Sequence, residues 1–191
     1  MARHNSQLEL SIDLGNDESD TTLLQLISSL SLEAVVNQTL HEAGVLQPVM
    51  LTLLITNDET IRNLNKQYRG QDKPTDVLSF PLLEKPIVNA PADQLWTLPE
   101  ATNGESAEIG VTEQVFVTPT ELPTNLGDIV ISWPTVIRQA TEVGHNSTYE
   151  LLYLLAHGVL HLVGFDDQTE EGYQAMIRIQ QAVMEATEQK A

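Results

Sequence analysis

The amino-acid sequence predicts an α+β fold, in which one mixed β-sheet packs against helices within a single domain spanning residues 1–191. Two observations support this prediction. Strand-like and helix-like hydrophobic patterns follow one another along the chain in mixed order, without an internal repeat. The chain also combines 191 residues with 41% hydrophobic residues, which is enough to build one substantial core.

The first part of the chain is expected to supply an edge strand, a helical segment and a buried strand. Polar and apolar residues alternate from Gln7 to Ile12, which is typical of an edge strand. From Asp20 or Thr21 to about Ala43, apolar residues recur at helical spacing before Gly44, which predicts one long helix or two short ones. The apolar run Val49–Thr56 predicts a buried strand.

A short helix, a loop and a second strand should follow. Asp58 is expected to cap the helix, which carries Tyr68 near its end. Residues Arg69–Asp76 are polar and predict a loop. The segment Val77–Phe80 then predicts a strand that ends at Pro81.

The segment from about residue 83 to residue 126 differs from the rest and resembles an insertion. It holds five prolines and no sustained hydrophobic period. Its seven acidic residues and one basic residue give a charge of -6, a third of the total. Connections this long are uncommon inside compact domains. We expect a partly ordered acidic insertion, and a hairpin around Val111–Val117 is one interpretation of its pattern.

Regular structure is expected to resume after the insertion. Gly127–Ser132 predicts a strand, and a helix from about Pro134 to Val143 would place proline in its first turn. Two final helices are expected from about Thr148 to Val163 and from Thr169 to Thr187.

The composition excludes several classes of protein. A formal charge of -18, from 27 acidic and 9 basic residues, argues against a basic protein that coats nucleic acid. The absence of cysteine excludes disulfides, thiolate metal sites and cysteine nucleophiles, so any metal must be held by histidine and carboxylate. No apolar run approaches the roughly 18 residues of a membrane span. We therefore expect a soluble, unexported cytoplasmic protein that does not contact a membrane.

Two histidines on the predicted helix 148–163 are the strongest candidates for chemistry. His157 and His161 are four residues apart, so both imidazoles lie on one face and can reach one metal ion. Gly164 can end the helix in a left-handed conformation and turn Asp166 or Asp167 back towards that ion. Two imidazoles and one carboxylate with an open position suit a hydrolytic site. The same histidine spacing also occurs on helices that bind no metal.

The stretch His157–Asp167 resembles the signature of the YbeY family, bacterial endoribonucleases of ribosomal RNA maturation, whose pattern is His-Gly-x-Leu-His-Leu-x-Gly-Tyr/Phe-Asp-His. Further blocks resemble the same family in the same order, apart from the insertion. These blocks are Asn65–Pro81, Gly127–Ser132, and Glu142–His145 with Glu150. The resemblance implies a mixed sheet with helices and one zinc ion held by three histidines.

By this resemblance, His157 and His161 match the first two zinc ligands, and the third ligand position falls on Asp167. Aspartate is a competent zinc ligand, but the exchange lowers the net charge of the site by one. Two histidines and one aspartate also resemble the sets that bind harder ions, so Zn²⁺ is the expected cofactor and manganese or iron are alternatives. Asp166 is an alternative ligand, although the family pattern makes it a neighbour of the ligand.

Arg69 matches the functional arginine of the family and is expected, with His157, to be catalytic. A guanidinium can hold two phosphate oxygens and stabilise the added negative charge of a phosphoryl transition state. From the residues alone, a structural salt bridge from Arg69 to Asp72 or Asp76 is the alternative.

Lys73 and His145 are expected to join Arg69 in binding the substrate. The alternative for His145 is a structural place near a helix C-terminus, where a cation interacts favourably with the helix dipole. Trp96 lies in the insertion without basic neighbours, so base stacking by its ring is not favoured. Gly158 stands where His-Glu-x-x-His metalloproteases carry their general base, which disfavours a peptidase of that type.

Together, the residues and the resemblance predict a metal-dependent endoribonuclease that cuts single-stranded RNA. The resemblance implies a role in ribosomal RNA processing, namely 16S rRNA 3′ end maturation, and in ribosome quality control. It implies ribosomal RNA and the small ribosomal subunit as partners. Because the chain is acidic overall, it is expected to bind free RNA weakly, and a recruiting protein is a further candidate partner. The alternatives are a ribosome-assembly factor with a mainly structural metal site, or a hydrolase of another phosphoester.

Overall fold

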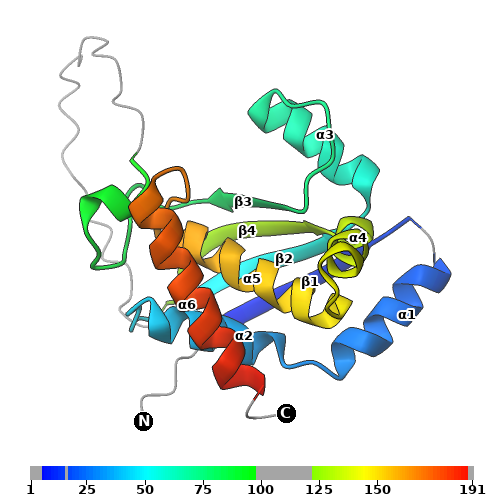
Figure 1. Ribbon diagram of the computed structural model, residues 1–191, viewed down its shortest axis with the longest axis horizontal. Coiled ribbons are helices and arrows are strands. Elements are labelled where there is room, and N and C mark those ends of the chain that lie inside the picture. The colour runs from blue at the N-terminus through cyan, green and yellow to red at the C-terminus, as the bar shows by residue number, and fades with distance from the viewer. Residues whose placement is uncertain (1–5, 16, 98–121, 189–191) are drawn as a thin grey trace.

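The sheet has four strands in the order β1-β2-β4-β3. The computed structural model describes residues 6–15, 17–97 and 122–188 (Figure 1). β1 pairs with β2 and β2 pairs with β4 in parallel, whereas β3 pairs with β4 in antiparallel orientation. The mixed sheet and the α+β class are therefore as predicted. The strands are β1 (Gln7–Asp13), β2 (Val49–Thr56), β3 (Val77–Pro81) and β4 (Thr124–Ser132).

Helices cover both faces of this sheet. α5 crosses one face, where α2 and α6 pack against it, and α3 lies on the other face (Figure 1). None of the described helices is both long and apolar enough to cross a membrane. The helices are α1 (Asp17–Ser28), α2 (Leu32–Glu42), α3 (Asp58–Arg69), α4 (Trp133–Val143), α5 (Ser147–Val163) and α6 (Glu170–Glu188), with a short 3-10 helix, η1 (Ala92–Gln94).

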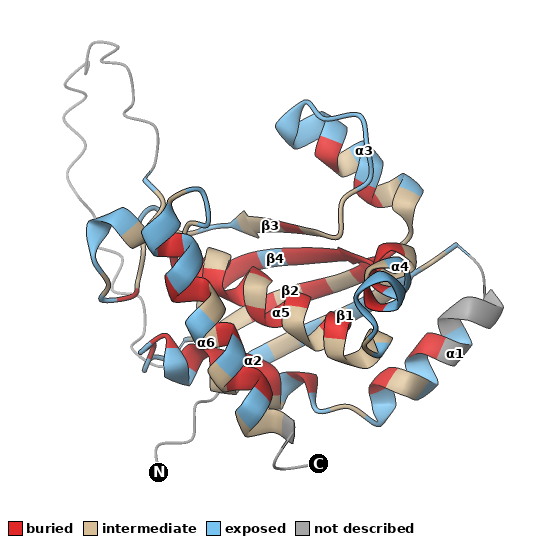
Figure 2. Cartoon of the chain, in the orientation of Figure 1, coloured by how far each residue is buried: buried red, intermediate tan, exposed pale blue. Residues whose placement is uncertain are grey.

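The alternation of side chains along the strands separates two cores. Ile129 and Ile131 of β4 face the main core, which they share with α5. Val130, between them, faces a smaller core with Ile61 of α3 and Leu78 of β3. Figure 2 shows buried residues along β2, β4 and α5. The nearly all-apolar sequence of α5 reflects this position, since its neighbours enclose the helix on most sides.

Two predicted boundaries differ from the structure, one at α3 and one at β4. The segment 20–43 forms two helices, which is one of the two predicted alternatives, because Ser29–Ser31 interrupts the chain between α1 and α2. The prediction that Asp58 caps α3 is wrong: the side chain of Asn57 accepts the hydrogen bond from the Thr60 backbone N–H. The Asp58 carboxylate instead accepts hydrogen bonds from α4 and the end of β4. Its partners are Ser132, Thr135 and Arg138.

The first part of the predicted insertion is built into the domain. We call residues 83–97 the strap, because this segment lies across the turn between α5 and α6. Its backbone donates hydrogen bonds from Ile87 to the Val163 carbonyl and from Trp96 to the Gly164 carbonyl. β4 begins at Thr124, three residues before the predicted start. The suggested hairpin at 111–117 lies outside the described residues.

Candidate metal centre and active-site cleft

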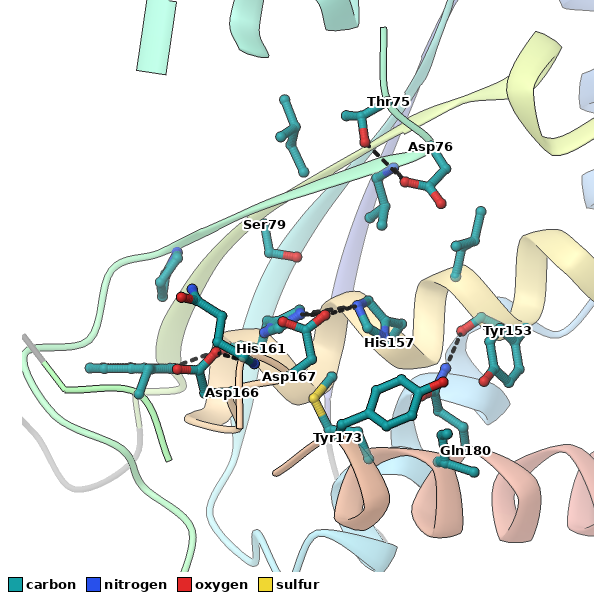
Figure 3. A pocket seen from close by; sticks show the side chains of 18 of the residues that line it. Thr75, Asp76, Ser79, Tyr153, His157, His161, Asp166, Asp167, Tyr173 and Gln180 are labelled. Atoms are coloured by element: carbon teal, nitrogen blue, oxygen red, sulfur yellow. Dashed lines mark hydrogen bonds and ion pairs between the residues drawn. The ribbon is translucent and has the colours of Figure 1, made fainter. Parts of the chain in front are cut away.

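Three side chains predicted as ligands come together at the C-terminal end of α5. His157 Nε2 lies 3.0 Å from His161 Nε2, and each of these atoms lies 3.7 Å from Asp167 Oδ2 (Figure 3). One ligand atom from each residue lies within 4.8 Å of the others. We refer to His157, His161 and Asp167 as the triad. The prediction that one helix face and the following turn would supply one cluster therefore agrees with the geometry.

The dimensions of the triad fit a small divalent ion. The point that lies in the plane of these three atoms and is equidistant from them is about 2.0 Å from each, which is the usual length of a zinc–nitrogen or zinc–carboxylate bond. Each member of the triad is partly accessible from the cleft, so the protein does not enclose the cluster on all sides. This arrangement leaves room for a substrate atom or a water molecule beside an ion.

A backbone hydrogen bond prepares His161 for metal binding. Its Nδ1 atom lies 3.0 Å from the carbonyl oxygen of Phe165. Because a carbonyl oxygen only accepts, Nδ1 must carry the hydrogen and donate it. In the neutral ring Nε2 is then left with its lone pair, and this is the atom that points towards His157 and Asp167.

His157 is held in its neutral form by burial. Burial is the largest cause that lowers the pKa of His157, and the neighbouring His161 lowers it further. The carboxylate of Asp167 and a hydrogen bond with the Gln180 side chain act in the opposite direction but do not overcome the loss of solvent. A neutral imidazole is the form that coordinates a metal ion.

Gln180 of α6 is a site residue that the sequence analysis missed. It is 1% exposed, and its amide nitrogen donates to the Tyr153 carbonyl at 3.3 Å. It thereby links α6 to α5 one turn before His157. A glutamine in an amphipathic helix resembles any other polar residue in sequence, so no local pattern marks it.

Asp167 is distinguished from its neighbour Asp166 by what each touches. Interaction with the His161 ring is the largest cause that lowers the pKa of Asp167, to about 2, and outweighs its burial. Asp167 is therefore ionised at neutral pH. Asp166 also borders the cleft, but its Oδ1 atom accepts the backbone N–H of Gln168 within the turn and does not belong to the triad.

The turn that delivers Asp167 depends on a glycine and on the strap. Gly164 has a φ of 133°, and a Cβ atom there would overlap the Cβ of Pro86. The strap also donates the Trp96 indole N–H to the His161 carbonyl at 2.9 Å. Trp96 therefore supports a candidate ligand, a role that its position in an aperiodic segment did not indicate.

The triad opens onto a cleft of about 1240 Å³. Its walls come from the end of α3, from β3, from α4, α5 and α6, and from the end of the strap. Arg69 borders the same cleft as the triad. Arg69 and His157 were predicted to act together, although 88 positions separate them in the chain.

The alternative in which Arg69 forms a structural salt bridge is not seen. Asp72 instead pairs with Arg62 at 2.6 Å and with Lys66 at 2.7 Å. The Asp76 carboxylate accepts the backbone N–H of Val77 and the side-chain amide of Gln139. Within the described part of the chain, no ion pair holds the Arg69 guanidinium away from the cleft.

The two other predicted substrate-binding residues lie outside the cleft lining. The Lys73 side chain is exposed on the loop after α3, where the buried Asn65 amide holds the Lys73 carbonyl. His145 lies between α4 and α5, with its Nε2 atom 2.5 Å from Glu150. Glu150 itself borders the cleft, so His145 is one residue removed from it.

Comparison with known proteins identifies the family. The model of the family described as "Endoribonuclease YbeY" matches residues 14–188. The chain belongs to the YbeY family. A YbeY endoribonuclease of Roseiflexus castenholzii is 38% identical over 143 residues, which cover 75% of this chain and 72% of that protein. Another, from Desulforamulus reducens, is 36% identical over 182 residues, which cover 95% and 93%.

One solved structure also matches along most of both chains. The solution structure of TM1509 from Thermotoga maritima has a TM-score of 0.48 and 22% sequence identity, and the match covers 95% of this chain and 93% of that one. Membership of the YbeY family rests on the family model and on the curated sequences.

Proposed function

We propose that this YbeY-family protein is a metal-dependent endoribonuclease that cuts single-stranded RNA. The observation that carries the proposal is that the triad and Arg69, which has no ion-pair partner among the described residues, border one open cleft. A cation site and a guanidinium on one cleft match the two requirements of phosphodiester cleavage. These are a Lewis acid at the reacting phosphate and a donor for the charge that develops there.

We assign separate roles to the residues of the site. His157, His161 and Asp167 hold one divalent ion, with Zn²⁺ as the first candidate. A bound ion of this kind polarises a phosphate oxygen or activates a water molecule. Arg69 donates hydrogen bonds to the equatorial oxygens of the phosphate as their charge increases. Lys73 and His145, which lie outside the cleft lining, are assigned to phosphates farther along the strand.

The surface of the cleft favours unpaired RNA. Tyr68 and Tyr173 border it, and these residues are 61% and 47% exposed. Tyr68 is held by an edge-to-face contact with Phe80, with ring centroids 5.1 Å apart. Exposed aromatic rings can stack on splayed bases, whereas the bases of a duplex are already stacked on one another.

We further propose that the substrate is ribosomal RNA in the cytoplasm. In this role the protein would act on the small ribosomal subunit, at the 3′ end of 16S rRNA, and in quality control of ribosomes. The acidity of the chain supports presentation of the RNA by the ribosome or by a recruiting protein, because a charge of -18 does not concentrate free RNA around the enzyme.

Cleavage of RNA by purified variants tests the proposal. Wild type, Arg69→Ala and His157→Ala are each freed of contaminating ribonucleases and incubated with single-stranded RNA and added Zn²⁺. We expect cleavage by wild type and a loss of roughly 100-fold or more in both variants, in line with removal of a group that stabilises a transition state. Equal degradation by all three preparations would remove catalysis from this site. Metal-bound wild type without cleavage would favour the assembly-factor alternative.

A further inference from the structure

The free edge of the sheet runs along the cleft. β3 is the last strand in the order β1-β2-β4-β3, and no described strand pairs with its outer edge. All of its residues, Val77–Pro81, border the cleft that also holds Arg69 and the triad. The backbone of β3 therefore faces the place where RNA would lie.

The register of β3 shows which of its N–H groups point outward. The Ser132 N–H donates to the Asp76 carbonyl, and the Leu82 N–H donates to the Leu126 carbonyl. In an antiparallel pair, residues that bond to the partner alternate with residues that do not. Because 76 and 82 bond to β4, positions 77, 79 and 81 direct their backbone groups to the open edge.

Among these three outward positions, only Ser79 offers an unused N–H donor. The Val77 N–H donates to its neighbouring Asp76 side chain at 2.8 Å. Pro81 has no N–H, and an outward-facing position on an edge strand is one of the few places where a sheet accepts proline. Ser79 has neither feature, and its N–H meets no acceptor within the described part of the chain.

Ser79 also lies next to the triad. Its hydroxyl group lies 3.5 Å from the carbonyl oxygen of Gly158, the residue that follows His157. Figure 3 shows the Ser79 side chain extending from β3 towards the two histidines. Exposed backbone N–H groups are common ligands of phosphate oxygens, because they are donors that carry no competing negative charge.

We propose that the Ser79 backbone N–H binds a phosphate oxygen of the RNA strand, in the cleft that Arg69 and the triad also border. This inference rests on the proposed function and adds the group that positions the sugar-phosphate backbone along β3. Such a contact is independent of base sequence. Ser79 is a substrate-positioning residue through its main chain, and its hydroxyl is not required.

The comparison of Ser79→Pro with Ser79→Ala tests this proposal. Proline removes the N–H without removing a bond to β4, whereas alanine keeps the N–H and removes only the hydroxyl. Binding is measured by fluorescence anisotropy on a single-stranded RNA whose 2′-hydroxyls are methylated, and a denaturing gel after each titration checks that the RNA is intact. We expect Ser79→Ala to bind within about twofold of wild type and Ser79→Pro to bind at least about tenfold more weakly, as for loss of a hydrogen bond to a charged group.

Thermal melting and metal content confirm that each variant is folded and loaded. If proline disturbs β3, Ser79 is replaced by the corresponding α-hydroxy acid. This change turns the peptide bond between Leu78 and Ser79 into an ester, which removes the same N–H hydrogen without introducing a ring. Equal binding by Ser79→Pro, the ester variant and Ser79→Ala would overturn the proposal.

A change in the RNA identifies the partner atom. Neutral methylphosphonate linkages are placed one at a time along the oligonucleotide, and each is tested against wild type and Ser79→Pro. One linkage should weaken binding to wild type and leave binding to Ser79→Pro nearly unchanged, because both changes remove the same contact. Additive losses at every linkage would contradict it. Since these assays measure binding, a failure of wild type to cleave RNA would reject the proposed catalysis without deciding this contact.

Discussion

At the scale of single residues, the position proposed for the third metal ligand is where this chain departs from the family signature that it resembles. Asp167 occupies a place where the family pattern has histidine, and the carboxylate lies at equal distances from the two imidazoles. Replacing an imidazole by a carboxylate lowers the charge of the site by one and adds a hard oxygen donor. The ion preference should therefore shift away from strict zinc selectivity.

We predict that Asp167→Ala loses the bound metal and Asp166→Ala retains it. Asp167 belongs to the triad, whereas the Asp166 carboxylate is engaged by the Gln168 N–H. Elemental analysis of the purified variants after equilibration with Zn²⁺ or Mn²⁺ measures this difference. Asp167→His should raise the preference for Zn²⁺ over Mn²⁺. Metal loss in Asp166→Ala alone would reassign the third ligand.

The lowered pKa of His157 predicts a pH dependence of stability. Its pKa in the folded, metal-free protein lies below the ordinary 6.5, mainly because of burial. The unfolded chain therefore binds a proton more readily than the folded one. The contribution of neutral His157 to the free energy of unfolding is fully present above pH 6.5. It is lost as the pH falls through 6.5 towards the pKa of His157 in the folded protein.

Melting temperatures of chelated protein between about pH 8 and pH 5 test this sign. We expect the wild type to lose stability on acidification and His157→Gln to lose less, because glutamine does not titrate. Glu84→Gln, on the exposed strap outside the triad, serves as a control for charge removal. A decline in His157→Gln as steep as in wild type would assign the effect to other groups.

At the scale of elements, the strands and most helices could be predicted, because the spacing of apolar residues indicates which face of a helix or strand is buried. The supports of the site could not be predicted in the same way. Trp96 contacts His161 across 65 positions and Gln180 contacts Tyr153 across 27, so neither contact leaves a local pattern. The N-cap of α3 was predicted one residue late, because Asn57 and Asp58 are both good capping residues. In the structure Asp58 accepts hydrogen bonds from Ser132, Thr135 and Arg138, which are distant in sequence, and Asn57 forms the cap.

The packing of α5 on β4 explains why a glycine follows His157. A Cβ atom at Gly158 would lie 2.8 Å from the Cγ2 atom of Ile129. A side chain here would therefore point into the sheet and away from the triad. The absence of a metalloprotease general base at this position follows from helix–sheet contact in this fold.

We predict that Gly158→Ala lowers the free energy of unfolding by about 1 kcal/mol. Alanine gains about 1 kcal/mol of helix propensity over glycine, but overpacking costs roughly 1–3 kcal/mol. Chemical denaturation of wild type, Gly158→Ala, Ile129→Val and the double variant measures the coupling. Gly158→Ala should cost less in the Ile129→Val background, because valine lacks the Cδ1 atom that would lie 2.9 Å from the added Cβ. Purely additive effects would exclude this contact as the cause.

At the scale of the whole molecule, positive charge is local. The four bases Arg62, Lys66, Arg69 and Lys73 lie on α3 and the following loop. Asp72 pairs with the first two of them, which leaves Arg69 and Lys73 as the cations of this region without a described ion-pair partner. Five acidic residues also border the cleft, namely Asp76, Glu142, Glu150, Asp166 and Asp167. A divalent ion held by the triad would offset part of this negative charge as a phosphate approaches.

This balance predicts weak, divalent-dependent binding of isolated RNA with a shallow dependence on salt. Each phosphate contact on a single strand contributes about 0.7 to the slope of log affinity against log salt, so Arg69 and Lys73 together give about -1.4. Anisotropy titrations with methylated RNA from about 50 to 300 mM salt, with and without chelator, measure the slope. We expect a dissociation constant of about 10⁻⁶ M or weaker at physiological salt, weakened further by chelation.

Lys73→Gln should reduce the slope by about 0.7, whereas Lys85→Gln, on the strap, should leave it unchanged. Tight binding that persists after chelation would show that the RNA is held by a surface other than this cleft.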